Sequence, residues 1–561
     1  MARTVGLGYQ NFEQVIENNN FYIDKTLFIK EWWENKDAVT LITRPRRFGK
    51  TLNLSMTEQF FSLKYADKSN LFSGFLIWKY AEYQRLQGTY PVISLSFANI
   101  KEANYITARR KICQILSNLY SEHNFLLKQD FLDKKERKFF EDVTVDMDDV
   151  TATLSIHQLT SYLAKYYNKK VIILLDEYDT PMQEAYVNGY WNELADFIRS
   201  LFNSTFKENP YLERALMTGI TRVSKESVFS DLNNITVVTT TSDLYTNSFG
   251  FTQQEVWNAL DEYGLTAKKK AVKEWYDGFT FGQKTDIYNP WSILNYLKFK
   301  KFSCYWSNTS SNGLVGKLIQ EGIADVKILF EDLLSGKTIC TAIDEQIIFN
   351  QLGDRESAIW SLLLASGYLK VANYTFNETQ GEEAYELTLT NKEIFLTFKN
   401  MIKGWFTEFT PAYNRFIKAL IAGDIKAMNQ YMNQVALKTF SYFDTGKHPS
   451  EETEPERFYH GFVLGLIVDL ADNYSITSNR ESGFGRYDVI LEPLNVKTEA
   501  IILEFKVHDK NSENTLEETV DEALKQIEKK QYAASLETKG IKAERIKKYG
   551  FAFEGKRVLI G

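Results

Sequence analysis

A run of five apolar residues followed at once by acidic ones constrains this chain more than any other feature. Val171-Ile-Ile-Leu-Leu175 has the length and composition of a strand buried on both faces, and Asp176, Glu177 and Asp179 come directly after it. At the end of such a strand Asp176 can hold the coordination shell of a Mg²⁺ ion, and Glu177 can polarise an attacking water. The run therefore predicts the acidic strand, of Walker B type, in a nucleotide site.

The partner of this run lies upstream. Val39–Thr43 has the pattern of a second apolar strand, and it leads into a loop that ends in Gly49-Lys50-Thr51, where a helical pattern begins. Such a loop directs backbone N–H groups, a helix N-terminus and a lysine at phosphate oxygens. We expect Gly49 to let the backbone approach the phosphates, Lys50 to contact them, and Thr51 to place its hydroxyl on Mg²⁺.

The rest of the loop departs from the usual pattern. It reads Arg44-Pro-Arg-Arg-Phe48, so arginine stands where the pattern has its first glycine. Arg46 and Arg47 either add positive charge at the phosphates or are solvated loop residues. Together with Phe48 they are predicted to belong to the nucleotide site.

A further apolar strand, Arg214–Thr218, supplies two more candidates. In an ATPase of this type a polar side chain at the strand end senses the γ-phosphate, so Thr218 or Thr221 is expected in that role. Arg222 is predicted to be an arginine finger or sensor, and the alternative is a structural ion pair.

Composition sets broader limits. The chain has 561 residues, which suggests about three domains at ~150 residues each. Hydrophobic residues make up 44% of the chain, which favours a large core. The net charge is −7, which argues against a protein that coats nucleic acid but not against a local basic groove. Three separated cysteines and the lack of a long apolar run predict a reducing, cytoplasmic setting without a membrane partner.

The order of elements predicts an α/β protein with three parts. Residues 1–310 alternate strands with amphipathic helices, as in a parallel sheet with flanking helices. Residues 311–410 contain a helix, Ile359–Leu369, and then two alternating segments, which favour a helical or winged-helix-like middle. Residues 411–561 begin with a helical lead-in, Pro411–Phe443, before a last α/β domain.

A second set of charged residues lies near the C-terminus. Asp488 heads one predicted strand, and Glu504-Phe505-Lys506 lies on the next. Residues i and i+2 of a strand share a face, so Glu504 and Lys506 project together while Phe505 turns to the core. Two carboxylates and a lysine on adjacent strands can bind Mg²⁺ and activate water for phosphodiester hydrolysis. The alternative for Glu504 and Lys506 is a solvated edge pair.

Both sets of residues resemble known families. The motifs of residues 5–310 resemble a bacterial AAA-ATPase-like family, which also reads Arg-Pro-Arg-Arg-Phe-Gly-Lys in its loop; they are Phe21-Tyr-Ile-Asp24-Lys25-Thr26, Arg44–Thr51, Leu175–Asp179, Thr218–Arg222, Trp275-Tyr-Asp-Gly278, Tyr288-Asn-Pro-Trp-Ser292 and Tyr305-Trp-Ser307. The resemblance implies an ATPase core. Asp24 and Lys25 are expected either to lie near the catalytic base or the nucleotide-responsive switch, or to pin the N-terminal segment.

The Asp…Glu-x-Lys pattern resembles the PD-(D/E)XK nuclease fold. Glu456 and His460 are one helical turn apart ahead of an apolar helix that resembles the family's first helix, whose acid completes the metal site. Gln526 and Tyr532, expected on one helix over Leu516–Leu536, resemble the family's Gln-x5-Tyr motif. The alternative for His460 is local helix packing.

The sequence therefore predicts a protein that binds and hydrolyses ATP and whose C-terminal, restriction-endonuclease-like domain is a Mg²⁺-dependent nuclease that acts on DNA under ATP control. The expected cofactors are ATP and Mg²⁺, with Mn²⁺ as an alternative to Mg²⁺ at the nuclease site. The expected partner is nucleic acid, and DNA is favoured over RNA. One alternative is a nucleotide-controlled switch that holds nucleic acid without cutting it, and another is an ATPase whose last domain is structural. The oligomeric state stays open.

Overall fold

The protein is described by a computed structural model in two compact units. One unit comprises Met1–Ser310 and Cys340–Ile394, and the other comprises Ser311–Ile339 and Phe395–Gly561. Each unit is considered by itself. The structure describes residues 2–128, 131–222, 229, 232–306, 313–321, 324–343, 356–378, 381–405, 410–443, 454–480, 486–495, 497–509, 513–554 and 557–561.

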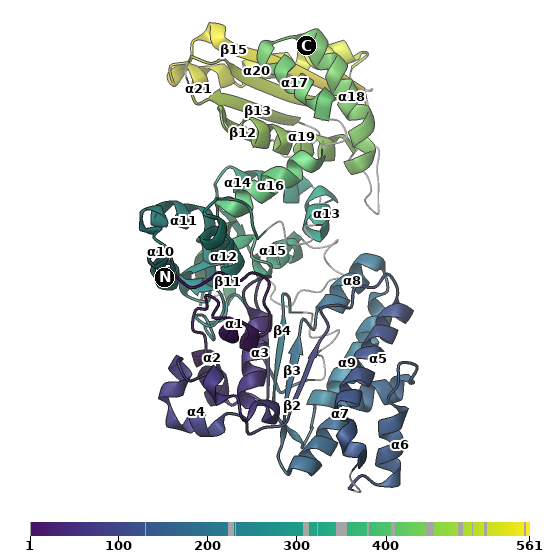
Figure 1. Ribbon diagram of the computed structural model, residues 1–561. Coiled ribbons are helices and arrows are strands. Elements are labelled where there is room, and N and C mark those ends of the chain that lie inside the picture. Colours follow the sequence, from purple (N-terminus) through teal and green to yellow (C-terminus); the bar gives the residue numbers. More distant parts are fainter. Residues whose placement is uncertain are drawn as a thin grey trace. The chain divides into compact units, whose positions relative to one another are not determined.

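A five-stranded parallel sheet forms the centre of the first unit (Figure 1). Its strand order is β2-β3-β4-β1-β5, so β4 lies between the strand of the glycine loop and the strand of the acidic run. The bounds are β1 Val39–Thr43, β2 Val92–Ser96, β3 Val171–Asp176, β4 Leu212–Gly219 and β5 Ile235–Val238. The predicted parallel sheet is confirmed, whereas β5 was missed because four residues carry little periodic signal.

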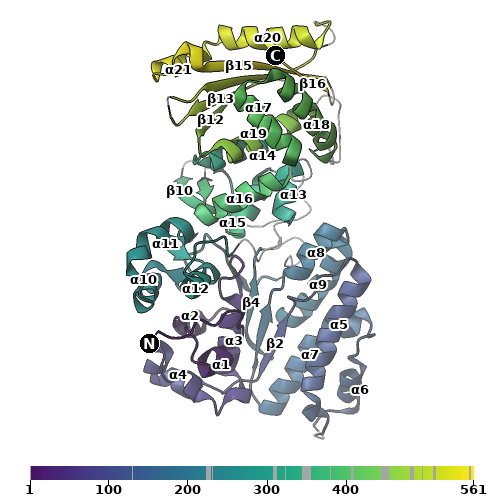
Figure 2. The same cartoon turned by 45° about the horizontal axis from the view of Figure 1, so that its top comes forward.

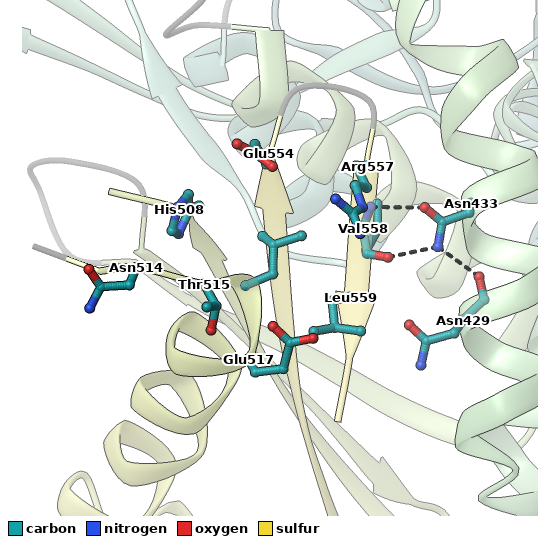
Figure 3. A pocket seen from close by; sticks show the side chains of 11 residues that line it. Asn429, Asn433, His508, Asn514, Thr515, Glu517, Glu554, Arg557, Val558 and Leu559 are labelled. Carbon is teal, nitrogen blue, oxygen red and sulfur yellow. Dashed lines mark hydrogen bonds between the residues drawn. The ribbon is translucent and has the colours of Figure 1, made fainter. Parts of the chain in front are cut away.

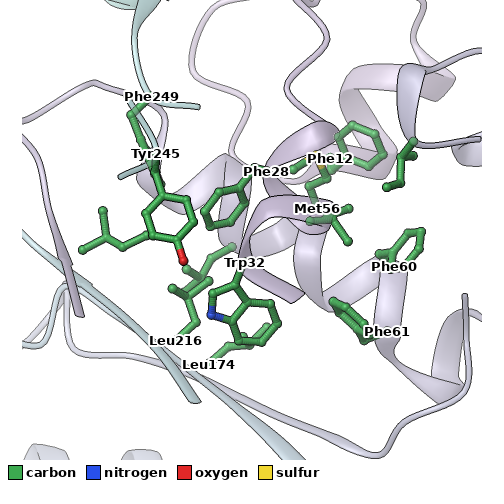
Figure 4. Packing of buried hydrophobic residues seen from close by; sticks show 14 of the residues in the cluster. Phe12, Phe28, Trp32, Met56, Phe60, Phe61, Leu174, Leu216, Tyr245 and Phe249 are labelled. Atoms are coloured by element: carbon green, nitrogen blue, oxygen red, sulfur yellow. The ribbon is translucent and has the colours of Figure 1, made fainter. Parts of the chain in front are cut away.

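Helices cover both faces of this sheet. Figure 1 shows α5, α7 and α9 on one side and α1 to α4 on the other. The bounds are α1 Phe12–Glu17, α2 Leu27–Asn35, α3 Lys50–Phe61, α4 Ala81–Leu86, α5 Tyr105–Glu122, α6 Lys134–Asp142, α7 Asp149–Tyr167, α8 Thr180–Asn188 and α9 Trp191–Phe206. Aromatic side chains of α1 to α3 pack on alternate residues of the strands, such as Leu174 and Leu216 (Figure 4). This core fixes the N-terminus of α3 at the edge of the sheet where the strands end.

Two smaller sheets and several helices come after the central sheet in the sequence. One antiparallel sheet, β6-β8-β7, and one of order β10-β11-β9 are present. Their strands are β6 Phe251–Thr252, β7 Phe279–Phe281, β8 Lys284–Tyr288, β10 Leu369–Asn377, β11 Glu382–Leu389 and β9 Ile339–Thr341, whose first residue belongs to the other unit. The helices are α10 Gln253–Glu262, α11 Lys269–Tyr276, α12 Pro290–Phe299 and α15 Glu356–Ala365. Helix α15 followed by the β10–β11 hairpin matches the element order predicted for the middle region.

The second unit is built on a mixed five-stranded sheet. Its strands lie in chain order, antiparallel except for the parallel pair β14–β15. They are β12 Tyr474–Arg480, β13 Arg486–Pro493, β14 Ala500–Val507, β15 Ile546–Glu554 and β16 Arg557–Ile560. The parallel pair needs a crossover, and α20 Leu516–Lys529 with α21 Tyr532–Thr538 provides it. The predicted α/β class is thus confirmed in both units.

Two layers of helices enclose this second sheet. Figure 2 shows α20 and α21 on the face opposite α17 and α19, in agreement with the packing of Ile527 on Ile490 and Ile502 and of Phe462 on Phe505. The remaining helices are α13 Gly313–Glu321, α14 Ala324–Leu334, α17 Thr410–Ala422, α18 Ile425–Phe443, α19 Glu454–Leu470 and α16 Lys392–Trp405, whose first three residues belong to the first unit. Among the described residues, no helix combines the length and the apolar character that crossing a bilayer requires.

The helix predicted over Leu516–Leu536 is wrong as a single element. It divides into α20 and α21 because Gln531 adopts a left-handed conformation with φ 53°. Gln526 therefore lies on α20 and Tyr532 begins α21, so the two residues predicted for one motif sit on different helices.

Candidate functional sites

The loop between β1 and α3 has the backbone of an anion-binding turn. Gly49 is left-handed with φ 84° and precedes the first residue of α3. Lys50 is only 5% exposed, and its ammonium donates to the carbonyl oxygens of Arg44 at 2.9 Å and Pro45 at 3.0 Å. Burial lowers the pKa of Lys50, and the carboxylates of the acidic run oppose this shift. The ammonium thus sits inside the curl of the loop, where phosphate oxygens bind in such turns.

Asp176 joins three elements at the edge of the sheet. Its Oδ2 accepts a hydrogen bond from Thr51 Oγ1 at 2.7 Å, and its Oδ1 accepts one from Thr218 Oγ1. Burial raises the pKa of Asp176, while both hydroxyl bonds favour the ionised form. The structure therefore brings together three residues predicted from separate motifs. Carboxylate and hydroxyl oxygens are ligands that suit Mg²⁺.

Glu177 has an unusual backbone beside this cluster. Its φ is 49°, a left-handed conformation that is uncommon for a residue with a side chain. Its carboxylate accepts a hydrogen bond from Thr180 Oγ1 at 3.0 Å in the first turn of α8. Conformations of this kind are concentrated at functional sites.

Asp179 is a residue whose role the sequence did not assign. It is fully buried, and its Oδ2 accepts hydrogen bonds from Ile220 N at 3.0 Å and from Thr221 N and Oγ1, both at 2.9 Å. Gly219 leaves it room, because a Cβ there would lie 2.8 Å from Asp179 Oδ1. Asp179 thus ties the loop after β3 to the end of β4. Of the two sensor candidates, Thr218 contacts Asp176 and Thr221 contacts Asp179.

Arg44, at the position of the missing glycine, is a structural residue. It is fully buried, and its guanidinium donates to the carbonyl oxygens of Thr43, Thr239 and Leu244. It also lies over the ring of Phe281, 4.4 Å from the centroid. Burial lowers the pKa of Arg44 to about 9. These bonds hold the start of the loop against the segment that follows β5.

Arg46 and Arg47 differ in what they do. The carbonyl oxygen of Arg46 accepts hydrogen bonds from Asn289 Nδ2 at 3.2 Å and from Trp306 Nε1 at 2.9 Å. Arg47 is exposed and left-handed with φ 64°, and its guanidinium lies 4.7 Å from the centroid of Trp291. The Tyr-Asn-Pro-Trp-Ser and Tyr-Trp-Ser motifs therefore support the loop directly.

Phe48 and Lys25 are both held by contacts within the first unit. Phe48 is buried against Phe279 and Phe281, so it anchors the loop rather than facing solvent. The ammonium of Lys25 donates to Glu255 and to the carbonyl of Asn247, all at 2.8 Å.

Asp24, next to Lys25 in the Phe21–Thr26 motif, also makes contacts that hold the N-terminal segment. It accepts hydrogen bonds from Thr26 and from the backbone N–H of Leu76. Asp24 and Lys25 therefore pin the N-terminal segment. Arg222 is partly exposed at the end of the described stretch 131–222, and its role stays a prediction.

The second unit brings its predicted carboxylates face to face. Asp488 on β13 lies directly opposite Glu504 on β14, and the two are 1% and 0% exposed. Lys506 follows Glu504 on the same face and is partly exposed. Phe505 points to the other face, where it packs against Phe551 with ring centroids 4.9 Å apart. The predicted arrangement of these residues on adjacent strands is what the structure has.

The break between α20 and α21 supplies two partners of Asp488. Its Oδ2 accepts hydrogen bonds from Lys530 Nζ at 3.2 Å and from Tyr532 Oη. Tyr532 was predicted for this site and Lys530 was missed. The left-handed Gln531 between them turns both side chains toward the strand. Gln526 lies one turn before Lys530 on α20, and its Nε2 is buried with no hydrogen-bond partner among the described residues.

The remaining predicted members of the site are on α19. Glu456 and His460 fall in the first turns of this helix, but their side chains lie outside the described residues. Their roles therefore stay predictions. Within the described parts of the chain, no group of three or more His, Cys, Asp or Glu side chains is arranged to hold a metal ion. Asp488 and Glu504 fit a divalent cation by their chemistry, as paired oxygen donors that leave other positions to water or substrate.

The second unit also contains a pocket of about 580 Å³ beyond the end of β14 (Figure 3). Its lining is polar for the most part and contains neither of the paired carboxylates; it comprises Asn429, Asn433, His508, Asn514, Thr515, Leu516, Glu517, Glu554, Arg557, Val558 and Leu559. Asn433 bonds both the N–H and the carbonyl of Val558, and Asn429 does the same for Ile560. These amides cover the outer edge of β16, which would otherwise be an open sheet edge.

Comparison with known proteins gives one family match for each of the two sequence regions that contain these residues. Residues 6–229 match the family described as a predicted AAA-ATPase, and residues 454–561 match the PD-(D/E)XK nuclease superfamily. The first match contains the loop, the acidic run and Thr218, and the second contains Asp488, Glu504 and Lys506. The two resemblances stated from motifs are thereby confirmed, and the chain contains an ATPase-like domain and a nuclease-superfamily domain.

Two further likenesses extend over longer stretches. An uncharacterized protein in the vnfD 5'region of Azotobacter chroococcum mcd 1 is 23% identical over 548 residues, which cover 95% of this chain and 94% of that protein. The relative therefore spans both domains. The Aeropyrum pernix ORC2 protein, solved as ADPNP-ADP complexes, is 9% identical, covers 68% of this chain and 92% of its own, and has a TM-score of 0.23. A TM-score of this size does not establish a common fold.

Proposed function

We propose that the protein binds and hydrolyses ATP and uses the nucleotide to control a Mg²⁺-dependent phosphodiesterase that acts on DNA. The observation that carries the nuclease part is the placement of Asp488 directly opposite Glu504, with Lys506 on the same face. The ATPase part is supported by the cluster in which Thr51 and Thr218 both donate to Asp176. Each cluster lies in the domain whose family match implies the corresponding chemistry.

At the ATP site each residue has a distinct proposed task. Lys50 would exchange its two carbonyl acceptors for oxygens of the β- and γ-phosphates, and the backbone at Gly49 would donate to them. Thr51 and Asp176 would hold Mg²⁺, which supplies charge neutralisation on the phosphates. Glu177 would accept a proton from the attacking water. Arg46, Arg47, Phe48, Thr218 and Arg222 complete the proposed site.

At the nuclease site Asp488 and Glu504 would hold a divalent cation, Mg²⁺ or Mn²⁺, whose chemistry is to polarise the scissile phosphate and activate water. Lys506 would orient that water and stabilise the negative charge that develops. Glu456 would complete the acidic set. His460, Gln526 and Tyr532 are proposed as accessory residues, and the hydrogen bond from Tyr532 to Asp488 supports this for Tyr532.

The proposal also includes the cellular compartment and the type of nucleic acid. We place the protein in the cytoplasm, which is supported by its three free cysteines, Cys113, Cys304 and Cys340. DNA is preferred to RNA as the substrate, and a stable oligomer is left open.

A second candidate function is a nucleotide-controlled switch that holds nucleic acid without cutting it. One observation favours it. The ammonium of Lys530 lies 3.2 Å from Asp488 and already compensates the charge that a catalytic cation would otherwise compensate. A site of this kind could retain affinity for nucleic acid while its metal binding is weak.

One experiment separates these functions. Purified protein is incubated with DNA or RNA, with Mg²⁺ or Mn²⁺, and with or without ATP, beside a Lys506→Ala variant. Cleavage by the wild type that disappears in the variant supports the nuclease. Binding of nucleic acid without cleavage under any of these conditions supports the switch and overturns the nuclease.

A further inference from the structure

The end of α12 and the turn after it carry three lysines and an exposed phenylalanine. Lys298 and Phe299 are the last residues of the helix, and Lys300 and Lys301 follow directly. All four side chains are exposed. The stretch 287–306 contains no aspartate or glutamate, although the chain as a whole has a net charge of −7. Residues 298–301, here called the lysine turn, are therefore a local basic surface on an acidic protein.

The lysines of this turn are available to a ligand. Among the described residues none of them is paired with a carboxylate, whereas Lys392 of the same unit forms an ion pair of 2.7 Å with Glu274. Lys298 lies in the last turn of α12, where a cation stabilises the helix end. Lys300 and Lys301 lie beyond the helix. Their charges therefore serve no partner within the part of the chain that the structure describes.

The backbone of the lysine turn is held in place by hydrogen bonds and by ring stacking. Lys300 is left-handed with φ 54°, and its N–H donates to the carbonyl of Tyr296 at 2.7 Å. The carbonyl of Lys301 accepts a hydrogen bond from Tyr305 Oη at 2.7 Å. The next residue, Phe302, stacks on Tyr296 with ring centroids 4.6 Å apart. Because the backbone is already ordered, a ligand of this surface would lose less free energy to ordering.

Phe299 is the aromatic ring of the lysine turn. Its side chain is 56% exposed, more than any other phenylalanine, tyrosine or tryptophan that the structure describes. The ring stacks on Tyr305, with centroids 6.4 Å apart and planes inclined by 25°. The ammonium of Lys298 lies 6.0 Å from its centroid. Phe299 thus has support from within the unit and a large apolar surface that remains in water, where burial against a flat partner would be favourable.

The combination of lysines and an exposed ring suits single-stranded nucleic acid. Ammonium groups contact successive phosphates, and an aromatic ring stacks on a base, which a single strand leaves open. A duplex keeps its bases stacked on one another and would leave Phe299 unused. An anionic membrane would attract the same lysines, but binding to a membrane surface needs a broader apolar face than one ring supplies.

We propose that the lysine turn is a binding surface for single-stranded nucleic acid on the first unit, where Lys300 and Lys301 contact phosphates and Phe299 stacks on a base. Lys298 adds positive charge beside that ring. The inference rests on the proposed function for the class of partner. It goes beyond that function because it assigns nucleic-acid contact to the unit of the ATP site, and it requires neither ATP hydrolysis nor cleavage.

The salt dependence of binding tests the lysines. The full-length protein is titrated into a fluorescent oligothymidylate in EDTA, without ATP, over a series of salt concentrations. The double variant Lys300→Gln/Lys301→Gln should bind more weakly, and the slope of log affinity against log salt should fall by about 1.4, since each phosphate contact in a single strand contributes about 0.7. Lys134→Gln/Lys135→Gln on α6 is the control, because it removes the same charge from another exposed site and should keep the wild-type slope.

A second variant tests stacking separately from charge. Phe299→Ala should weaken binding by roughly 5- to 150-fold with an unchanged salt slope, whereas Phe299→Trp should retain the affinity. Phe376→Ala is the matched control, since Phe376 is 51% exposed on β10 but lies opposite Glu383 in the hairpin; it should bind as the wild type does. Thermal melting checks that each variant is folded, and exposed positions should shift it little.

The outcomes distinguish this inference from the function on which it rests. If the wild type cleaves DNA but both lysine-turn variants bind the oligonucleotide normally, the surface is overturned and the function stands. If no cleavage occurs but binding depends on Phe299 and the two lysines, the surface is supported and the nuclease fails. If the wild type does not bind single-stranded DNA or RNA at low salt, the inference is overturned. Binding of phosphatidylserine vesicles in place of the oligonucleotide would overturn it as well.

Discussion

Asp176 in the first unit and Asp488 in the second are both buried aspartates, yet different groups satisfy them. Asp176 accepts hydrogen bonds from two hydroxyl groups, those of Thr51 and Thr218. Asp488 accepts them from an ammonium, that of Lys530, and from the phenol of Tyr532. Neutral donors leave the negative charge of a carboxylate available to a cation, whereas an ammonium compensates it. We therefore expect a metal ion at the first site to find a carboxylate whose charge is not compensated, and a metal ion at the second site to compete with Lys530.

The two sites also differ in how they are supported. The phosphate loop is held by residues from several distant segments, among them Asn289, Trp306 and Phe281. Two partners of Asp488, Lys530 and Tyr532, come from one short break between two helices. We expect the geometry of the first site to tolerate single changes around it, and the second to depend on the position of α20 and α21.

The largest expected effect tests the nuclease site itself. Asp488→Ala, Glu504→Ala and Lys506→Ala should each reduce DNA cleavage by about 10³-fold or more and leave ATP hydrolysis unchanged, because the proposed ATP site lies in the other unit. Glu492→Ala is the control, since Glu492 lies on the same strand and face as Asp488 but pairs with Lys539 at the surface. Cleavage of linear DNA is measured on gels, and persistent cleavage by all three variants in a contaminant-free preparation would exclude these residues.

The next prediction separates the two acids of the first site. Glu177→Gln should slow ATP hydrolysis by ~10²- to 10⁴-fold with little change in ATP affinity, because only the group that accepts the water's proton is lost. Asp176→Ala should instead impair Mg²⁺ binding. Phosphate release and a binding titration distinguish the two. Glu184→Gln, one to two turns further along α8, should hydrolyse ATP normally, and a wild-type rate for Glu177→Gln would remove Glu177 from the role of base.

A smaller effect is expected for binding at the loop. Lys50→Ala should weaken ATP affinity by ~10- to 100-fold, because a charge-assisted contact to the phosphates is lost. Isothermal titration calorimetry measures it, with the exposed Lys64→Ala as a matched loss of one lysine. Equal affinities of Lys50→Ala and wild type would show that the loop does not hold phosphate.

The smallest effect addresses the contrast between the two aspartates directly. Lys530→Met keeps the aliphatic stem but removes the charge beside Asp488, so Mn²⁺ binding should tighten by ~3-fold or more. A Mn²⁺ titration without DNA detects the change, and the exposed neighbour serves as control in Lys529→Met. Unchanged or weaker Mn²⁺ binding in Lys530→Met would mean that Lys530 does not compete with the cation.

Local pattern was enough for most of the elements. The continuous apolar run of β3 gave its position to within a residue, because a strand buried on both faces favours apolar side chains at successive positions, and the mainly apolar β1 was placed equally well. The four-residue β5 was too short to leave a pattern. The break after α20 also escaped prediction, since the left-handed conformation of Gln531 is not marked by glycine or proline.

The sequence by itself determined which chemical groups stand at the ends of the strands, because strand period and residue type are properties of neighbouring residues. It placed Glu504 and Lys506 on one face and put acids directly after β3. Only the tertiary structure decided which donors meet those acids, because Thr51 and Asp176 are 125 positions apart and Lys530 and Asp488 are 42 apart. It also decided that Arg44 is a buried support rather than a phosphate ligand. The energy of a buried charge depends on what surrounds it in space, and no local pattern records that.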